Sequence, residues 1–371
     1  MLGALALSLL IVWCLLAVQT IVNLVVFRSI EEADGAPSSR VSIVIPARNE
    51  ERYIGRTLDA ALRQDYPLFE VVVVDDGSTD GTAGEIQKRG RDPRLVSSAA
   101  RTLEPGWLGK PNALATGAEM ASGDWILFMD ADVELHPRAL SDAVAACERN
   151  GWDYLALLPH FEREGFWEEV LMPLICVAAF VYMPTYLAFA PRTRLAAGGG
   201  AFGLVRRSAY DAIGGHAAIK SSVVDDIRLA MELKRAGFKT MARLGLDRVR
   251  LRMYHGLGEI VDGFTKNAHA VFGDSTLRPI FFLLLTLAIG VAPFLWLFVP
   301  SSLDLGASLL LLLFCRTLVQ LRLRFPLWPI LLSPLTTAVG FVIVLRSLRM
   351  ARRDRVVRWR GREYPRETTE F

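Results

Sequence analysis

The feature that most restricts the fold of this chain is a long uncharged segment at its N-terminus. Leu2–Phe27 is a run of 26 residues without a charge, and a helix needs only about 20 to cross a bilayer. A cleavable signal peptide would begin with basic residues and have a shorter apolar run that ends at small residues. We therefore predict a retained anchor over residues 1–28, with Arg28 on the cytoplasmic side.

Three more apolar stretches lie between residues 280 and 345: Ile280–Val299, Leu303–Leu321 and Leu327–Leu345. The tail after them, residues 346–371, has nine arginines against four acids, a net charge of +5, which should hold it in the cytoplasm. Three crossings would place the tail outside, so the prolines near the last stretch favour a re-entrant or interfacial segment there. These prolines are Pro326, Pro329 and Pro334.

Between the anchors, residues 36–275 have the composition of a globular domain. Because 52% of the whole chain is apolar, extended disorder is excluded and membrane insertion is favoured. The four cysteines include no Cys-x-x-Cys pair, so neither a disulfide framework nor a cysteine-rich zinc site is supported. We predict a multi-pass protein of the inner (cytoplasmic) membrane whose central domain faces the reducing cytoplasm.

Strand-like and helix-like runs alternate in this domain. Val41–Pro46 and Val71–Asp75 are β-branched runs typical of buried parallel strands, and Glu50–Gln64 between them has apolar residues at helical spacing. This is a βαβ unit, with a right-handed crossover. Trp125–Asp130 is a further strand. The sequence thus predicts an α/β domain with a Rossmann-like, mostly parallel sheet.

Each of these strands ends at a polar cluster: Pro46–Glu50, Asp75–Ser78 and Asp130–Asp132. Open α/β sheets bind ligands at the carboxyl ends of their strands, so the three clusters indicate one site. The chain has no GxGxxG after its first strand and no GxxxxGK[ST] motif. A dinucleotide-dehydrogenase site and a P-loop site are therefore excluded.

Asp130 and Asp132 are candidate metal ligands. In an extended segment, residues two apart face the same side, so both carboxylates would point into one cavity. Two like charges so placed are costly without a cation between them, and Mg²⁺ or Mn²⁺ suits such hard oxygen ligands. Glu134 continues the alternation as a third candidate. A solvated turn is the alternative explanation of this acidic segment.

Together these segments resemble the family 2 glycosyltransferases of the GT-A fold. The resemblance covers residues 36–275 and rests on VSIVIPARNEE at 41–51, VDDGSTDGT at 74–82, Gly109-Lys110 and the acidic triplet. It implies inverting transfer of a sugar from a nucleotide diphosphate sugar, expected to be a UDP-sugar, with a divalent metal at Asp130 and Asp132. The donor-binding residues that it implies are Pro46, Arg48, Glu50, Asp75, Asp76, Gly77, Lys110, Asp130 and Ala131.

The resemblance also implies a catalytic carboxylate at the start of a helix, which the segment 223–230 matches. The match identifies Asp226 as the general base that takes the proton of the acceptor hydroxyl. Adjacent helical residues diverge by about 100°, so Asp225 is expected to be an N-cap or an orienting neighbour. The alternative is that both acids are only capping charges.

Two segments are expected on the acceptor side. Gly199 and Gly200, in a run of three glycines, resemble the acceptor-side loop of the family. Lys266 and His269 stand where processive and ceramide-type relatives carry a Gln/Arg-x-x-Arg-Trp motif. The Arg and the Trp are missing here, which argues against processive polymer synthesis. An ordinary interfacial helix is the alternative for this stretch.

The acceptor class follows from Val170–Ala190, which has 21 uncharged residues inside the domain. A crossing there would put Asp132 and Asp226 on opposite sides of the bilayer, so we predict an interfacial insertion at 166–190. This insertion and the flanking anchors indicate a membrane lipid acceptor, glycosylated at a hydroxyl or carboxyl group. The layout resembles hopanoid- and carotenoid-associated and, more distantly, ceramide-type lipid glycosyltransferases.

Two rival functions remain open at this point. A polyprenyl-phosphate glycosyltransferase would need less of a base and more of a cationic clamp, for which Arg206, Arg207 and Lys220 are candidates. A non-catalytic membrane scaffold that binds sugar nucleotide would be expected to have lost an acid from one cluster, and all are present. No nucleic-acid partner is predicted for any of these functions.

Overall fold

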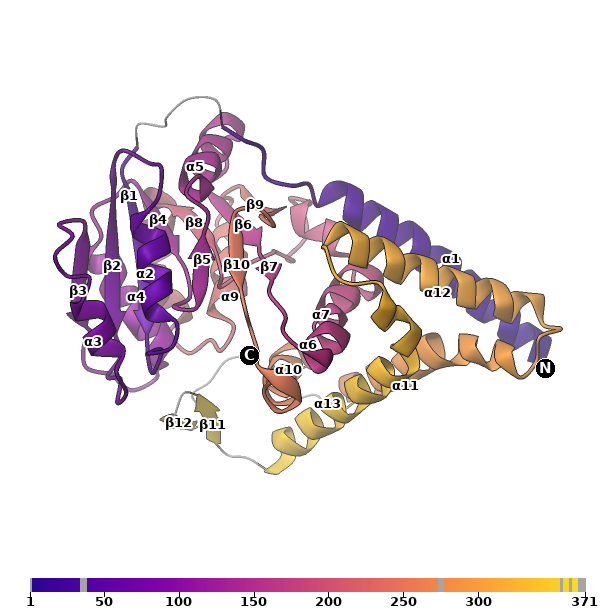
Figure 1. Ribbon diagram of the computed structural model, residues 1–371. Coiled ribbons are helices and arrows are strands. Elements are labelled where there is room, and N and C mark those ends of the chain that lie inside the picture. The colour runs from indigo at the N-terminus through magenta and orange to yellow at the C-terminus, as the bar shows by residue number, and fades with distance from the viewer. Residues whose placement is uncertain (1, 34–38, 273–276, 354–355, 360–361, 366–371) are drawn as a thin grey trace.

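The computed structural model describes residues 2–33, 39–272, 277–353, 356–359 and 362–365. Figure 1 shows an α/β domain at one end and apolar helices at the other, with the N-terminus at the far tip of the helical part. The chain passes from the first helix into the domain and returns to the helices afterwards. The two predicted parts of the molecule are therefore spatially separate.

The centre of the domain is a seven-stranded sheet with the order β3-β2-β1-β4-β8-β6-β9. β1, β2, β3 and β4 are parallel to one another, and β8 is antiparallel to both of its neighbours. The mostly parallel α/β sheet predicted from the sequence is confirmed. The strands are β1 Val41–Ala47, β2 Phe69–Asp75, β3 Leu95–Ala99, β4 Trp125–Phe128, β6 Tyr154–Leu158, β8 Gly203–Arg206 and β9 Thr240–Leu244.

Helices pack on this sheet, and a small second sheet lies beside it (Figure 1). The helix expected at Glu50–Gln64 begins later, at Ile54, because the backbone N–H groups of Tyr53 and Ile54 both bond to the Glu50 carbonyl in a turn. The helices are α2 Ile54–Leu62, α3 Thr82–Gln87, α4 Gly109–Met120, α5 Ala139–Asn150, α8 Arg207–Ala212, η3 Gly215–Ile219 and α9 Asp225–Arg235. The second sheet contains β5 Val133–Leu135, β7 His160–Phe161 and β10 Val249–Leu251.

The segment predicted to be an interfacial insertion is a series of short helices rather than one long helix. α1 (Leu2–Val26) holds it: Asn23 Nδ2 donates to the carbonyls of Phe180 and Met183, both at 2.8 Å, and Gln19 Nε2 donates to Val181 at 2.7 Å. These amides satisfy carbonyl groups that short helices leave without a partner. The series is α6 Phe166–Leu171, α7 Pro173–Val177, η1 Ala178–Tyr182 and η2 Thr185–Phe189.

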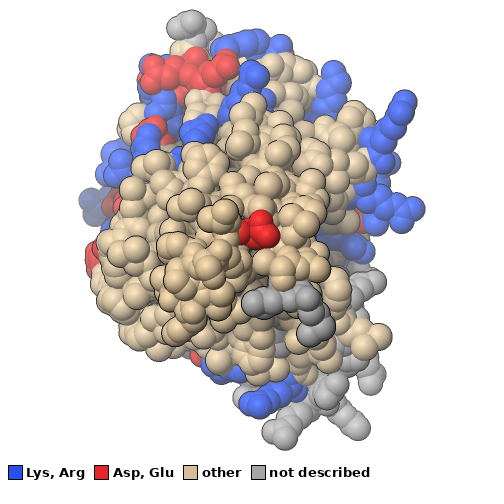
Figure 2. Space-filling model, turned by 90° about the vertical axis from the view of Figure 1, so that its right-hand side faces the viewer, with Lys and Arg blue, Asp and Glu red and all other residues tan. Residues whose placement is uncertain are grey.

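Three of the described helices are long and apolar enough to cross a membrane: Gly3–Val26, Leu303–Arg322 (α12) and Trp328–Arg349, which joins η5 (Trp328–Leu332) to α13 (Ser333–Arg353). The first two lie side by side in Figure 1. The expected stretch Ile280–Val299 is broken into α11 (Leu277–Val291) and the 3-10 helix η4 (Ala292–Leu297), with Pro293 near the break. Figure 2 shows that the end of the molecule formed by these helices is largely uncharged, with basic and acidic residues toward the edges of the view and one acidic group near the middle.

The chain after α12 returns to the α/β domain. Arg324, just past α12, pairs with Asp247 at 2.5 Å, and Arg346 of α13 pairs with Asp262 of α10 (Gly256–Phe272) at 2.9 Å. Both ends of the third apolar stretch therefore contact the domain.

Beyond α13 lie two short strands, β11 (Val356–Trp359) and β12 (Arg362–Pro365), paired antiparallel. Figure 1 shows them beside the α/β domain and remote from the N-terminal tip of α1.

Candidate active site

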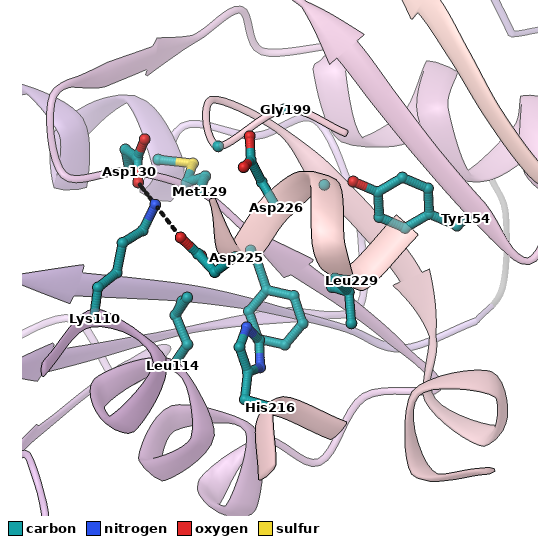
Figure 3. A pocket seen from close by; sticks show the side chains of 13 residues that line it. Lys110, Leu114, Met129, Asp130, Tyr154, Gly199, His216, Asp225, Asp226 and Leu229 are labelled. Atoms are coloured by element: carbon teal, nitrogen blue, oxygen red, sulfur yellow. Dashed lines mark ion pairs between the residues drawn. The ribbon is translucent and has the colours of Figure 1, made fainter. Parts of the chain in front are cut away.

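Acidic and basic side chains from three separate segments meet in one pocket. Lys110 comes from the first turn of α4, Asp130 follows β4, and Asp225 and Asp226 open α9. Lys110 Nζ lies 2.9 Å from Asp130 Oδ1 and 3.4 Å from Asp225 Oδ1, the two ion pairs drawn in Figure 3. These residues are 115 positions apart at the extremes (225 − 110), so the sheet and α9 bring them together.

Lys110 provides positive charge to this group of carboxylates. Burial disfavours its ammonium, but the charges of Asp130, Asp225 and Asp226 outweigh burial and raise the pKa of Lys110 well above its usual value. About a fifth of the side chain (21%) is exposed to solvent. Lys110 is therefore a permanent cation at the mouth of the pocket.

The two adjacent aspartates point in different directions. Asp225 faces Lys110, whereas the carboxylate of Asp226 points away from it, toward Gly199 (Figure 3). Burial raises the pKa of Asp225 to about 6, although Lys110 opposes the shift. The N-cap residue of α9 is Val224, so Asp225 is not the N-cap, and both acids lie in the first turn of the helix. Asp225 pairs with Lys110, so it is more than a charge at the helix terminus.

The glycine run from 198 to 200 lies against these acids. A Cβ at Gly200 would lie 2.6 Å from Asp130 Oδ2, and one at Gly198 would clash with the backbone carbonyl of Asp226. The N–H of Asp130 donates to the Gly200 carbonyl at 3.0 Å. The backbone can approach the two acids this closely because these residues lack a side chain. Gly199 and Gly200 line the pocket, and their role on the acceptor side stays a prediction.

The predicted donor residues of β1 and β2 form a second cluster at the same sheet edge. Ala47 and Asp75 are paired in register, and Asp76 N donates to the Ala47 carbonyl at 2.8 Å. Arg48 Nη1 donates to the carbonyls of Asp76 and, at 3.1 Å, Gly77. Pro46 pairs with Val74 one step earlier, and Glu50 N donates to Thr82 Oγ1 at 2.8 Å. The two loops are thus bound to each other.

The predicted metal ligands do not follow one extended segment. β4 ends at Phe128, and Ala131 and Asp132 form a turn, so the expected alternation is wrong beyond Asp130. Glu134 lies on β5 and pairs with Arg56 at 3.2 Å. Within the residues that the structure describes, no group of three or more His, Cys, Asp and Glu side chains forms a metal site. The hard carboxylate oxygens of Asp130 and Asp132 still fit Mg²⁺ or Mn²⁺ that takes its other ligands from phosphate and water.

Other predicted residues lie outside the pocket lining. Lys266 and His269 are on α10, and the side chain of His269 is outside the described residues. Arg207 donates to the carbonyls of Gly123 and Ala121, at 2.7 and 2.6 Å.

Arg206 pairs with Asp153 at 3.3 Å and stacks on the Trp125 ring, and Trp125 is the first residue of β4. Arg206 and Arg207 thus contact the start of β4, at the other end of the strand from Asp130. They do not form the cationic clamp expected of a polyprenyl-phosphate enzyme in this pocket.

Three positions at the site received no binding or catalytic role in the sequence analysis. Tyr154 and His216 line the pocket, and Arg362 contacts Asp76. Burial and Lys110 lower the pKa of His216 to about 3, and its Nδ1 lies 2.8 Å from Tyr210 Oη, so it is a neutral structural histidine. Tyr154 is buried in β6 and carried no local signal, because a tyrosine in an apolar strand is typical of any core.

Comparisons with known proteins identify this architecture. Residues 42–214 match the family model "Glycosyl transferase family 2". The 4,4'-diaponeurosporenoate glycosyltransferase of Staphylococcus aureus (strain USA300) is 28% identical, over 87% of this chain and 88% of the relative. Among solved structures, the mannosyltransferase PcManGT from Pyrobaculum calidifontis in complex with GDP-Man and Mn²⁺ is similar with a TM-score of 0.57. It is 19% identical, and the match covers 95% of this chain and 99% of that one.

The likeness to the archaeal enzyme shows the fold, and the family match shows the activity class. The match begins one residue into β1 and ends just before η3, so it includes Lys110, the Asp130 turn and the glycine run, and it stops short of α9. The chain is therefore a glycosyltransferase of the GT-A fold, and its residues 42–214 match the family 2 glycosyl transferase model.

Proposed function

We propose that this enzyme transfers a sugar, with inversion, from a nucleotide diphosphate sugar to a hydroxyl or carboxyl group of a membrane lipid. The observation that carries the proposal is the meeting of Lys110, Asp130, Asp225 and Asp226 in one pocket beside a glycine loop. The PcManGT complex contains GDP-Man, which supports a nucleotide sugar as donor. UDP-sugars remain our first expectation.

The proposed roles follow from the geometry. Asp226, turned toward Gly199 and away from Lys110, accepts the proton of the acceptor hydroxyl as its oxygen attacks the sugar (Figure 3). Lys110 lies where it can stabilise negative charge on the departing diphosphate. Asp225 fixes the Lys110 ammonium from the opposite side. A carboxylate acceptor would need no base, since it is already ionised.

Asp130 and Asp132 would hold Mg²⁺ or Mn²⁺. When bound, the metal would neutralise negative charge on the leaving diphosphate. The Mn²⁺ in the PcManGT complex supports this assignment. Asp130 also pairs with Lys110, so the lysine and the metal would act on the same phosphate groups.

A lipid acceptor is supported by the link between α9 and the apolar insertion. Lys234, in the last turn of the helix that opens with the two aspartates, donates to the carbonyls of Ala188 and Leu195, both at 2.6 Å. The helix that opens with the two aspartates is thus bonded to the end of the insertion. The name of the Staphylococcus aureus relative supports a lipid carboxylate in particular.

We also propose that the catalytic domain and the basic tail lie on the cytoplasmic side of the inner membrane. The contacts Arg324–Asp247 and Arg346–Asp262 support this topology, because they join both ends of the third apolar stretch to the same domain.

The test is a transfer assay with the full-length enzyme in lipid nanodiscs. Radiolabelled UDP-sugars and GDP-mannose are supplied with a lipid extract, with Mn²⁺ or with a chelator, and label in the organic phase is counted. We expect metal-dependent label in lipid with at least one donor. Nucleotide binding without label in any lipid would favour the scaffold function and refute transfer.

A further inference from the structure

The C-terminal strand pair reaches the nucleotide edge of the sheet. Arg362, the first residue of β12, donates from Nη1 to Asp76 Oδ2 at 2.5 Å and from Nη2 to the Asp76 carbonyl at 3.1 Å. These two residues are 286 positions apart in the chain. A two-stranded pair is marginally stable by itself, so contact with the domain is what fixes β12.

The carboxylate that receives Arg362 is rigid and buried. Asp76 is 4% exposed, and its N–H is bonded to Ala47 of the neighbouring strand. Asp75 beside it is engaged separately, since its Oδ1 accepts from the N–H and hydroxyl of Ser78, at 2.8 and 2.7 Å. Arg362 therefore contacts a preorganised group and not a mobile loop.

A second guanidinium reaches the same place. Arg48 Nη1 bonds the Asp76 carbonyl and lies 4.0 Å from Asp76 Oδ2. A Cβ at Gly77 would lie 3.6 Å from Arg48 Nη1 and 3.7 Å from Arg362 Nη2, so both arginines lie against the same face of this glycine. Two guanidiniums thus contact one aspartate, and arginine is the preferred partner of phosphate groups.

We propose that Arg362 belongs to the donor site: it positions the Asp76 carboxylate and, with Arg48, supplies positive charge that binds the nucleoside diphosphate. This inference rests on the proposed function, because it takes a nucleotide diphosphate sugar as the ligand. It gives the basic tail a role in the active site beyond that of a topology determinant. The opposite role, a latch that donor must displace, predicts tighter binding when Arg362 is removed.

The experiment measures nucleotide binding to the full-length enzyme in detergent by calorimetry, with UDP and GDP as probes and no acceptor present. Arg362→Ala should weaken binding of the preferred nucleotide about tenfold, the scale of one lost charge-assisted contact. Arg362→Lys keeps the charge but not the forked geometry, so it should restore part of the affinity. Arg346→Ala is the matched control, because it removes an arginine–aspartate pair of the same C-terminal region at α10 and should bind like wild type.

The readouts separate positioning from folding. Donor KM should rise in Arg362→Ala with kcat little changed, and the melting temperature without nucleotide should equal that of Arg346→Ala. If wild type binds nucleotide and Arg362→Ala binds it equally well or more tightly, this inference is refuted while the proposed function stands. If wild type binds neither UDP nor GDP, the proposed function itself fails.

Discussion

The two ends of the site arrange their charged side chains differently. In the pocket at β4 and α9, Lys110 faces the carboxylates of Asp130, Asp225 and Asp226. At the edge of β1 and β2, Arg48 and Arg362 face the carboxylate of Asp76. Carboxylates attract a cation, and guanidinium groups attract an anion.

In the proposed function, one donor molecule is shared between the two ends. The arginine edge would bind the nucleotide, and the acidic pocket would bind the metal and the reacting sugar. The parallel arrangement of β1, β2 and β4 makes the division feasible, because their carboxyl ends lie along one edge of the sheet. Changes at the acidic end should therefore affect chemistry, and changes at the arginine end should affect donor affinity.

The largest effect is expected from Asp226→Asn. With a hydroxyl lipid as acceptor, loss of the base should lower kcat about a thousandfold, with donor KM nearly unchanged. Single-turnover assays with saturating donor measure this directly. Glu232→Gln on the same helix is the matched control, since Glu232 pairs with Arg235 at 2.6 Å, outside the pocket lining. Full transfer to hydroxyl lipid by the Asn variant would show that Asp226 is not the base.

Metal removal should have the next largest effect, and it should affect the acidic pocket more than the arginine edge. Chelation is expected to lower transfer about a hundredfold, while affinity for UDP at the arginine edge changes less. Asp130→Asn should prevent recovery on adding Mn²⁺, and Glu134→Gln should recover fully, because Glu134 pairs with Arg56. A Glu134 variant that fails to recover would restore the original three-ligand prediction.

Asp225→Asn should change the pH dependence of stability. The folded-state pKa of Asp225, about 6, lies above its ordinary value of 3.8. Its contribution to stability is therefore full below pH 3.8 and lost as pH rises through 6, by about 3 kcal/mol at most. Lys110 stays charged across this range.

The melting temperature of Asp225→Asn should therefore rise relative to that of wild type as the pH is raised from 4 to 7. Tryptophan fluorescence with chelator present measures both melting temperatures. A constant difference at every pH would mean that Asp225 is not buried in the way the structure describes.

The smallest effect is expected from Gly198→Ala. Its Cβ would clash with the Asp226 carbonyl, so either the loop or the start of α9 must shift, at a cost of about 1–3 kcal/mol. Transfer should fall while UDP affinity is retained, which again assigns the defect to the acidic end. Gly84→Ala in α3 is the control, because nothing lies within 4 Å of its Cβ position. Equal behaviour of the two variants in melting and transfer assays would contradict the close approach.

Much of the site was predictable because its parts sit at ends of regular elements. β-branched runs located β1 and β2, and the acids after them had to meet at one edge once the strands were parallel. The helix start at Asp225 and its stop near Gly237, where φ is +91°, were also local signals. The turn at Asp132 was not predicted, because extension beyond β4 was assumed from spacing alone.

By itself, the sequence determined the long apolar stretches, the strands β1, β2 and β4 and the identity of the acids, because these depend on composition and on periodicity along a short segment. Tertiary structure decided which carboxylate faces Lys110, which faces the glycine loop, and that Glu134 pairs with Arg56 instead of joining Asp130. It also brought Arg362 to Asp76. The physical reason is that charge pairing depends on distance in space, and only the folded chain path sets that distance.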